Sequence, residues 1–244
     1  MKTALVTGAA RGIGLATTQQ FLTQGWQVIM VDRDADALEE TAAPLERTLS
    51  VVADVSDPDQ VAGLAARHTR IDALINNAGV ADFGPIQDTD FARWRTVMET
   101  NLDGVFLMSQ AFTPALAATR GAIVNIASIS GLRASTLRVA YGTSKAGVIA
   151  LTQQQAVELG EMGIRANAVC PGPVRTKLAM AVHTPEIIAA YHDAIPLNRY
   201  GSEDEIATVI TFLCSAGASY VTGQTIAVDG GFEATGVGLP ALRS

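Results

Sequence analysis

The chain has few of the residues that build disulfide-stabilised or metal-binding sites. Among its 244 residues, the only cysteines are Cys170 and Cys214, and the only histidines are His68, His183 and His192. Two cysteines are too few for a disulfide framework or a zinc cluster, and the histidines show no ligand spacing. We therefore expect reduced thiols and no bound metal.

Long apolar runs and an excess of basic residues are also lacking. No apolar run approaches the roughly 18 residues of a membrane span, and the first apolar segment begins too close to Met1 to leave room for a signal peptide. The 17 Lys and Arg are outnumbered by 24 Asp and Glu, and a net charge of −7 argues against nucleic acid or an anionic membrane as partner. We expect a cytoplasmic protein that acts on a small molecule.

Apolar runs alternate with helical patterns along the whole chain. Hydrophobic residues make up 48% of it, which is ample for one large core. Alternation of strands and helices is typical of βαβ units and a parallel sheet. We predict a single doubly wound α/β domain of Rossmann type over residues 1–244, with a mostly seven-stranded parallel sheet. The predicted strands are 4–6, 27–31, 48–53, 71–75, 122–127, 164–169 and 225–228. The first predicted helix contains Phe21. Further helices are predicted at 34–44, from Ser56, at 94–118, at 139–160 and from Ser202 to about 215.

A glycine-rich loop separates the first strand from the first helix. The loop contains Gly8, Gly12 and Gly14, which allow a ligand to approach the backbone closely. The start of a helix directs unpaired N–H groups toward such a loop, where a pyrophosphate can bind. The spacing is not the common Gly-x-Gly-x-x-Gly, so the loop alone leaves open a turn that only packs a helix on a strand.

An acidic residue follows the second predicted strand, as in many dinucleotide-binding folds. Asp32 lies 18 residues after Gly14, where a carboxylate accepts hydrogen bonds from the adenosine ribose and repels a 2′-phosphate. Arg11 and Arg33 argue the other way, because a guanidinium can pair with that phosphate. We predict NAD, since a carboxylate facing a phosphate is the costlier mismatch. Asp32 can also cap the next helix.

Three polar residues are arranged for proton transfer. Tyr141 and Lys145 are four residues apart in a predicted helix and share one face, although such a pair is most often exposed on a helix surface. A neighbouring ammonium lowers the pKa of a phenol, which suits it to general acid/base chemistry. Ser128 ends a predicted strand 13 residues before Tyr141, where its hydroxyl can reach a substrate oxygen. Ser130 is the nearby alternative, and either serine can simply cap a turn.

Taken together and in order, these segments resemble the short-chain dehydrogenase/reductase family. The resemblance runs from residue 3 to about 232. Its motifs are Thr7-Gly8-x-x-x-Gly12-x-Gly14, Asp32, Asp54-Val55, Asn76-Asn77-Ala78-Gly79, Asn101, Ser128, Tyr141-x-x-x-Lys145, Pro171-Gly172 and a closing segment ending at Gly231.

The resemblance implies a role for each matching position. Tyr141 is the general acid/base, Lys145 holds the nicotinamide ribose, Ser128 binds the reacting oxygen, and Asn101 holds a water that links Lys145 to solvent. The catalytic set is therefore Asn101, Ser128, Tyr141 and Lys145. The implied cofactor-binding set is Gly8, Arg11, Gly12, Ile13, Gly14, Asp32, Asp54, Val55, Asn77, Ala78, Gly79, Tyr141, Lys145, Pro171, Gly172, Val174 and Thr176.

Two arginines and a long connection bear on the substrate. Arg138 precedes Tyr141 by three residues and Arg133 follows Ser128 by five, and either guanidinium could bind an anionic substrate or face water. Ser130 and Arg138 are the candidate substrate residues. Residues 175–200 form the longest predicted connection, and we expect them to act as a substrate lid.

The combined prediction is an NAD-dependent oxidoreductase that interconverts a polar secondary alcohol, either a sugar or polyol or a small hydroxy acid, and its ketone. An NADPH-dependent 3-oxoacyl thioester reductase is the enzymatic alternative. A non-catalytic dinucleotide sensor is the alternative from another class, although it has no need of the full catalytic set. The resemblance also implies a homo-oligomer, a tetramer or dimer, and Val148, Leu151 and Leu159 form either an apolar stripe for that contact or part of the core.

Overall fold

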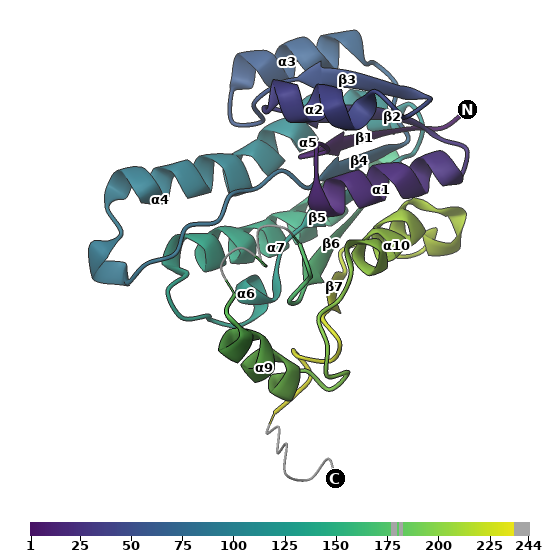
Figure 1. The fold of residues 1–244 in the computed structure, drawn as a ribbon. Helices are drawn as coiled ribbons and strands as arrows, with labels where there is room; N and C mark the ends of the chain where they lie inside the picture. Colours follow the sequence, from purple (N-terminus) through teal and green to yellow (C-terminus); the bar gives the residue numbers. More distant parts are fainter. Residues whose placement is uncertain (177–179, 181–182, 237–244) are drawn as a thin grey trace.

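The apolar runs of the sequence form one parallel sheet (Figure 1). The computed structural model describes residues 1–176, 180 and 183–236. Within them, the strand order is β3-β2-β1-β4-β5-β6-β7, so the predicted seven-stranded doubly wound fold is confirmed. The strands are β1 (Thr3–Thr7), β2 (Gln27–Asp32), β3 (Thr48–Val52), β4 (Ala73–Asn76), β5 (Ala122–Ile126), β6 (Arg165–Pro171) and β7 (Thr225–Val228).

Helices connect the strands, and most begin at the signals that the sequence contains. The predicted capping box is present, with the Ser202 side chain accepting from the Glu205 N–H. The helix expected from Ser56 instead starts after Asp57, whose carboxylate accepts the first backbone N–H groups. The described helices are α1 (Gly12–Thr23), α2 (Ala35–Ala42), α3 (Pro58–Arg67), α4 (Phe91–Met98), α5 (Gly104–Ala117), α6 (Ile129–Leu132), α7 (Val139–Leu159), α9 (Pro185–Ala194) and α10 (Glu203–Cys214).

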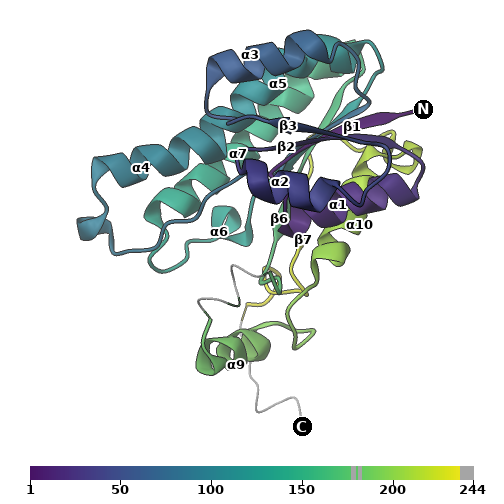
Figure 2. The same cartoon turned by 45° about the horizontal axis from the view of Figure 1, so that its top comes forward.

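The helices form one layer on each face of the sheet. Figure 2 separates α3 and α5 on one side of the strands from α1, α2 and α10 on the other. Side chains alternate along β1 accordingly: Ala4 and Val6 pack with Phe21 of α1, whereas Leu5 packs with Phe112 of α5. Because both faces are covered, the central strands are buried along their length.

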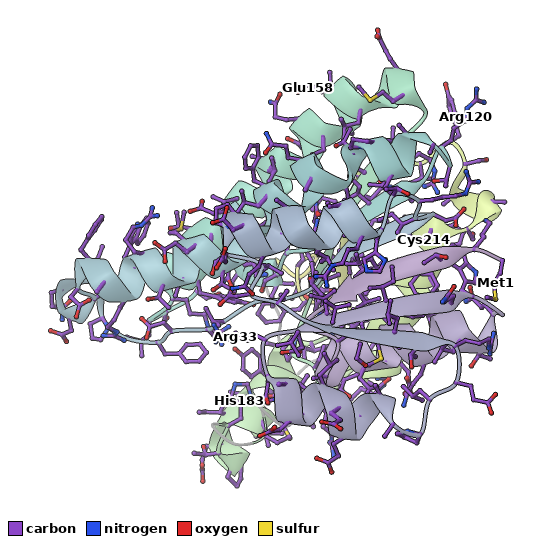
Figure 3. The ribbon with its side chains drawn as sticks, turned by 90° about the horizontal axis from the view of Figure 1, so that it is seen from above. Met1, Arg33, Arg120, Glu158, His183 and Cys214 are labelled. Atoms are coloured by element: carbon purple, nitrogen blue, oxygen red, sulfur yellow. The ribbon has the colours of Figure 1, made fainter. Side chains whose placement is uncertain are left out.

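All loops that matter for ligand binding leave the sheet at one edge. The strands are parallel, so their carboxyl ends lie together. In Figure 3, Arg33, which follows β2, and His183 lie toward that edge, whereas Met1, Arg120 and Cys214 lie toward the opposite edge. Figure 1 shows α9 apart from the two helix layers, at the same carboxyl edge as α6.

Candidate active site

The loops after β1 and β4 are joined by hydrogen bonds at the middle of this edge. Thr7 Oγ1 accepts from the backbone N–H groups of Asn77 and Ala78, each at 3.0 Å. Asn77 Nδ2 donates to the carbonyl oxygens of Thr7 at 2.9 Å and Gly8 at 3.1 Å. The strand order reverses between β1 and β4, and doubly wound folds bind their ligands in the crevice at that point.

The glycine loop fits closely against this junction. Gly8 and Gly12 have φ of +64° and +60°, a conformation that disfavours side chains. A Cβ on Gly14 would lie 2.1 Å from the Gly8 carbonyl oxygen, so only glycine fits there. The first turn of α1, Gly12 to Leu15, contains no acidic residue, and Arg11 provides no side-chain cap. The positive end of α1 therefore suits a pyrophosphate.

The carboxylate of Asp32 is fixed at the end of β2. Its oxygens accept from the backbone N–H groups of Ala10 and Asp34, each at 3.1 Å. Arg11, which could have opposed Asp32 in binding a 2′-phosphate, instead pairs with the Asp34 carboxylate. Asp34 also caps α2 by accepting from the Ala37 N–H. The predicted capping role of the Asp32 side chain thus belongs to Asp34.

The second arginine near the adenosine position also faces a carboxylate. Arg33 Nη1 lies 3.8 Å from Asp54 Oδ2. Burial acts to raise the pKa of Asp54, but hydrogen bonds from Ser56 and the charge of Arg33 outweigh it, and the pKa is lowered overall. Val55, beside Asp54, is buried in the core cluster under α3 and α5. Asp54 is thus a charged partner for Arg33, whereas the side chain of Val55 belongs mainly to the core.

Ser128, Tyr141 and Lys145 meet at the carboxyl end of β5. Lys145 Nζ donates to the Ile126 carbonyl oxygen at 2.7 Å and lies 5.8 Å from the centre of the Tyr141 ring. Ser128 Oγ caps α6 by accepting from the Ser130 N–H at 3.1 Å, and it also hydrogen-bonds Tyr141. The capping role of Ser128 is therefore confirmed, and the contact with Tyr141 is compatible with the predicted role in binding a substrate oxygen.

The acid/base balance of this group differs from the expectation. Burial raises the pKa of Tyr141, against the lowering influence of the Ser128 hydrogen bond and the Arg138 charge. Burial lowers the pKa of Lys145 to about 8, partly offset by Cys170. The expected depression of the Tyr141 pKa by Lys145 is therefore wrong for these side chains alone, because desolvation of the phenolate outweighs the neighbouring charges.

Asn101 lies in a π-helical turn that the sequence did not predict. Residues Glu99–Asp103 form this turn between α4 and α5. The buried Asn101 side chain accepts from the Val80 N–H at 2.8 Å and donates to the Val80 carbonyl and to Ser144 Oγ. A Cβ on Gly79 would lie 3.2 Å from Asn101 Oδ1 and 3.5 Å from Lys145 Nζ, so the amide and the ammonium both lie close to Gly79.

A cavity of about 280 Å³ opens over these residues. Twelve predicted site residues line it: Ile13, Asn77, Gly79, Ser128, Ser130, Arg138, Tyr141, Lys145, Pro171, Gly172, Val174 and Thr176. The other predicted residues lie outside its lining, along the glycine loop, at the end of β2, after β3 and β4, and, for Asn101, in the π-helical turn. The predicted residues thus divide between this cavity and the part of the crevice where the adenosine is predicted to bind.

Aromatic side chains that the sequence did not indicate form the outer wall of this cavity. His183, Tyr191, Phe232 and Phe83 line it. His183 and Tyr191 stack with centroids 5.5 Å apart, and His183 Nδ1 lies 2.9 Å from the Tyr200 hydroxyl. These residues are widely spaced in the sequence, and no local motif contains them.

The two candidate arginines have different positions. Arg138 lines the cavity. Arg133 pairs with Glu233 at 2.7 Å and donates to the carbonyl oxygens of Glu233 and Thr235. Arg133 therefore holds the segment after Phe232 and does not compete with Arg138 for a substrate.

The predicted lid, residues 175–200, is described only in part. Its residues 177–179 and 181–182 lie outside the described residues. Its described part includes α9, whose Thr184 caps Ile187 N, and contributes His183 and Tyr191 to the cavity. The described portion of residues 175–200 therefore borders the cavity that Ser128, Tyr141 and Lys145 line.

Across the described ranges, no helix is long and apolar enough to cross a membrane, and no three potential metal ligands gather.

Comparison with known proteins agrees with this geometry. Residues 8–233 match the family model described as Enoyl-(Acyl carrier protein) reductase. Galactitol 2-dehydrogenase (L-tagatose-forming) from Cereibacter sphaeroides is 40% identical over 238 residues, which are 94% of each chain. The 3-oxoacyl-acyl-carrier-protein reductase FabG from Thermotoga maritima is 39% identical over 94% of this chain and 97% of its own. The crystal structure of levodione reductase superimposes with a TM-score of 0.92 at 33% identity, covering 96% of this chain and 98% of its own. The chain belongs to the short-chain dehydrogenase/reductase family of oxidoreductases, which act on alcohol and ketone groups.

Proposed function

We propose that this protein is an NAD-dependent oxidoreductase that interconverts a polar secondary alcohol and its ketone. The observation that carries the proposal is the convergence of Ser128, Tyr141 and Lys145 on one cavity beside the crevice between β1 and β4. The nicotinamide would accept or supply the hydride. The protein must then hold the carbinol carbon and move one proton.

Tyr141 is the general acid/base of this proposal. Its raised pKa keeps the phenol protonated at neutral pH, which suits proton donation to a forming alcohol. In the oxidation direction, the positive charges of Lys145 and the oxidised nicotinamide would favour the phenolate. The hydroxyls of Ser128 and Tyr141 would both donate to the substrate oxygen and stabilise its developing negative charge.

Lys145 and Asn101 are the proposed route for the proton. Lys145 would hold the nicotinamide ribose from its position in the cavity lining. The three hydrogen bonds of the Asn101 amide occupy both its N–H groups and one lone pair of its oxygen. A water linking Lys145 to solvent would therefore bind the remaining Asn101 lone pair or a nearby backbone carbonyl.

The preference for NAD rests on the charges around Asp32. Arg11 and Arg33, the two guanidinium groups that could attract a 2′-phosphate, face Asp34 and Asp54. Asp32 remains as an uncompensated carboxylate at the ribose position, which favours two free ribose hydroxyls. The remaining implied cofactor residues, from Gly8 to Thr176, would then hold the pyrophosphate, adenine and nicotinamide amide.

The relatives support a polar alcohol but also include an acyl-thioester reductase. An NADPH-dependent 3-oxoacyl thioester reductase is therefore the second candidate. Rates with NAD and NADP at matched concentrations distinguish the two, since a clear preference for NADP would favour the thioester reductase. A dinucleotide sensor would bind NAD and turn over no alcohol or ketone.

The deciding test combines a substrate panel with replacement of Tyr141. Sugars, polyols, hydroxy acids and simple secondary alcohols would be screened by nicotinamide absorbance. Tyr141→Phe is expected to lower kcat at least about a hundredfold, because general acid/base catalysis contributes about that much, while the Kd for NAD stays within about twofold. Tyr220→Phe is the matched control, because that ring is fully exposed. Equal turnover by both variants would contradict the proposed role.

We also propose that the protein is cytoplasmic and forms a homo-oligomer, a dimer or tetramer. Phe106 on α5 and Val157 on α7 are 48% and 78% exposed. Leu151 borders an open hollow of about 700 Å³ between these helices. Val148, which was a candidate for the same stripe, is fully buried in the core and takes no part. The mass of the protein in solution tests the proposed oligomer.

A further inference from the structure

Two cationic side chains line the cavity. Of the described residues that line it, Arg138 and Lys145 are cationic, and none is an aspartate or glutamate. Lys145 Nζ is hydrogen-bonded to the Ile126 carbonyl and lies 5.8 Å from the centre of the Tyr141 ring. Arg138 is therefore the cation on the side of the cavity that is left for the substrate.

The Arg138 guanidinium rests on aromatic faces and not on a carboxylate. Its central carbon lies 4.9 Å from the centre of the Phe83 ring and 6.0 Å from that of the Tyr141 ring. In the part of the chain that the structure describes, no acidic side chain forms an ion pair with it, whereas Arg133 on the same segment is paired with Glu233. A half-buried guanidinium stacked on aromatic rings keeps its N–H groups available for an anion.

Backbone contacts fix the position of Arg138. Gly84 and Arg138 form a parallel β-bridge, and the Gly84 N–H donates to the Leu137 carbonyl at 3.0 Å. The Arg138 carbonyl accepts from the Gly142 N–H at 2.7 Å in the first turn of α7. These contacts place Phe83 and Arg138 on adjoining segments and set the guanidinium at a fixed offset from Tyr141. Such preorganisation lowers the cost of binding an anion.

The neighbouring His183 adds no further cation to the cavity. Burial lowers the pKa of His183, and the charge of Arg138 lowers it further. His183 Nδ1 is engaged with the Tyr200 hydroxyl at 2.9 Å. At neutral pH His183 is thus uncharged, and among the described residues of the outer wall Arg138 is the cation that stands beside aromatic side chains.

We infer that the alcohol oxidised here carries a carboxylate, and that this carboxylate binds the Arg138 guanidinium while the hydroxyl binds Ser128 and Tyr141. The inference rests on the proposed function and selects the hydroxy acid from the polar alcohols considered there. Arg138 is then the residue that determines substrate specificity. A planar carboxylate matches the fork of a guanidinium, and a cavity of about 280 Å³ that also admits a nicotinamide limits the acid to a short chain.

The test compares each acid with its neutral amide. Lactate and lactamide, 3-hydroxybutyrate and 3-hydroxybutyramide, and 4-hydroxypentanoate and its amide vary the spacing between hydroxyl and carboxyl groups. For at least one pair, the wild-type kcat/KM should favour the acid tenfold or more, as a charged hydrogen bond in a partly buried site provides. In Arg138→Gln that ratio should fall at least tenfold, mainly through KM, and Arg138→Lys should retain part of it.

Arg133→Gln is the matched control, because it removes the same charge from a paired arginine outside the cavity lining. It should change the acid-to-amide ratio less than twofold. A wild-type enzyme that turns over neutral polyols and prefers none of the acids would overturn the inference and leave the proposed function standing, even if Arg138→Gln failed to fold. An acid preference that survives in Arg138→Gln would also overturn it. Absence of turnover with every alcohol would overturn both.

Discussion

Replacement of Asp32 by asparagine tests the charge argument for NAD most directly. Asn keeps the shape of the side chain and one oxygen that can accept from the Ala10 or Asp34 N–H. It removes the negative charge that would face the 2′-phosphate of NADP. The change keeps the packing but loses one of these two hydrogen bonds, so the ratio of NAD to NADP activity, in which that loss largely cancels, measures the repulsion.

The magnitude follows from Coulomb's law. Two unit charges 4 Å apart interact with about 1 kcal/mol in water and about 4 kcal/mol at the effective dielectric of a protein surface. Asp32 is half-buried at the solvent-exposed edge of the sheet, so the lower part of this range applies. With a phosphate charge between about −1.5 and −2, we expect about 2 kcal/mol, which is a factor of about 30 in selectivity.

The assay is kcat/KM for NAD and NADP with one substrate at low ionic strength. In Asp32→Asn the ratio of NAD to NADP should fall about 30-fold. Adding Asp34→Asn should lower it further, because Arg11 would lose its carboxylate partner and could bind the 2′-phosphate. Asp36→Asn, which removes the same charge from the exposed first turn of α2, should leave the ratio unchanged. A wild-type preference for NADP, or an Asp32→Asn ratio within twofold of wild type, would refute the reasoning.

Two further predictions concern stability. The lowered pKa of Lys145, about 8 against an ordinary 10.5, means that the unfolded chain holds a proton between these pH values that the folded chain has released. The free energy of unfolding of wild type should therefore rise with pH relative to that of Lys145→Met. The rise is up to about 3 kcal/mol across this pH range, at 1.36 kcal/mol per pKa unit. Urea titrations at pH 7.5 and 10 measure it, and they would show no such rise if the ammonium were solvated. Gly14→Ala should abolish NAD binding and destabilise the fold, since its Cβ would collide with the Gly8 carbonyl, whereas Gly63→Ala, with open space around it, should stabilise α3 by about 0.5–1 kcal/mol. Thermal melts of both variants with and without NAD check this pair, and a Gly14→Ala protein that bound NAD normally would contradict it.

Local signals explain why much of the fold was predictable from the sequence. Strands buried on both faces appear as apolar runs, and the Ser202–Glu205 capping box marks the start of α10 through hydrogen bonds within one turn. The observed strand ends differ from the predicted ones by one or two residues, because pairing with the neighbouring strand determines where a strand ends. β6 continues through Pro171 because that residue still pairs with Val228 on β7.

Features that depend on distant contacts were not predictable. His183, Tyr191 and Phe232 become neighbours only when the segments that contain them fold to one cavity with the ends of β5 and β6. The π-helical turn at Asn101 interrupts a pattern that is typical of one continuous helix. The net direction of the Tyr141 pKa shift depends on burial, which spacing along a helix does not reveal.

The charge environment illustrates the same limit. The sequence positions of Asp32, Arg11 and Arg33 are enough to predict charged groups near the dinucleotide. They do not predict which charges pair, because the loops after β2 and β3 determine where the partners Asp34 and Asp54 lie. The sequence alone therefore predicts where the adenosine would bind. The ion pairs in the structure are needed for the argument that the dinucleotide is NAD and not NADP.

The π-helical turn at Glu99–Asp103 also constrains the length of the chain. A π turn accommodates one residue more than the α-helix around it. Deleting one residue there would restore regular helical hydrogen bonding but remove the wide turn that places Asn101 against Val80. Inserting a further residue, which the turn does not absorb, would rotate α4 by about 100° relative to α5. Changes of length in this region should accordingly be tolerated far less than substitutions at its exposed positions.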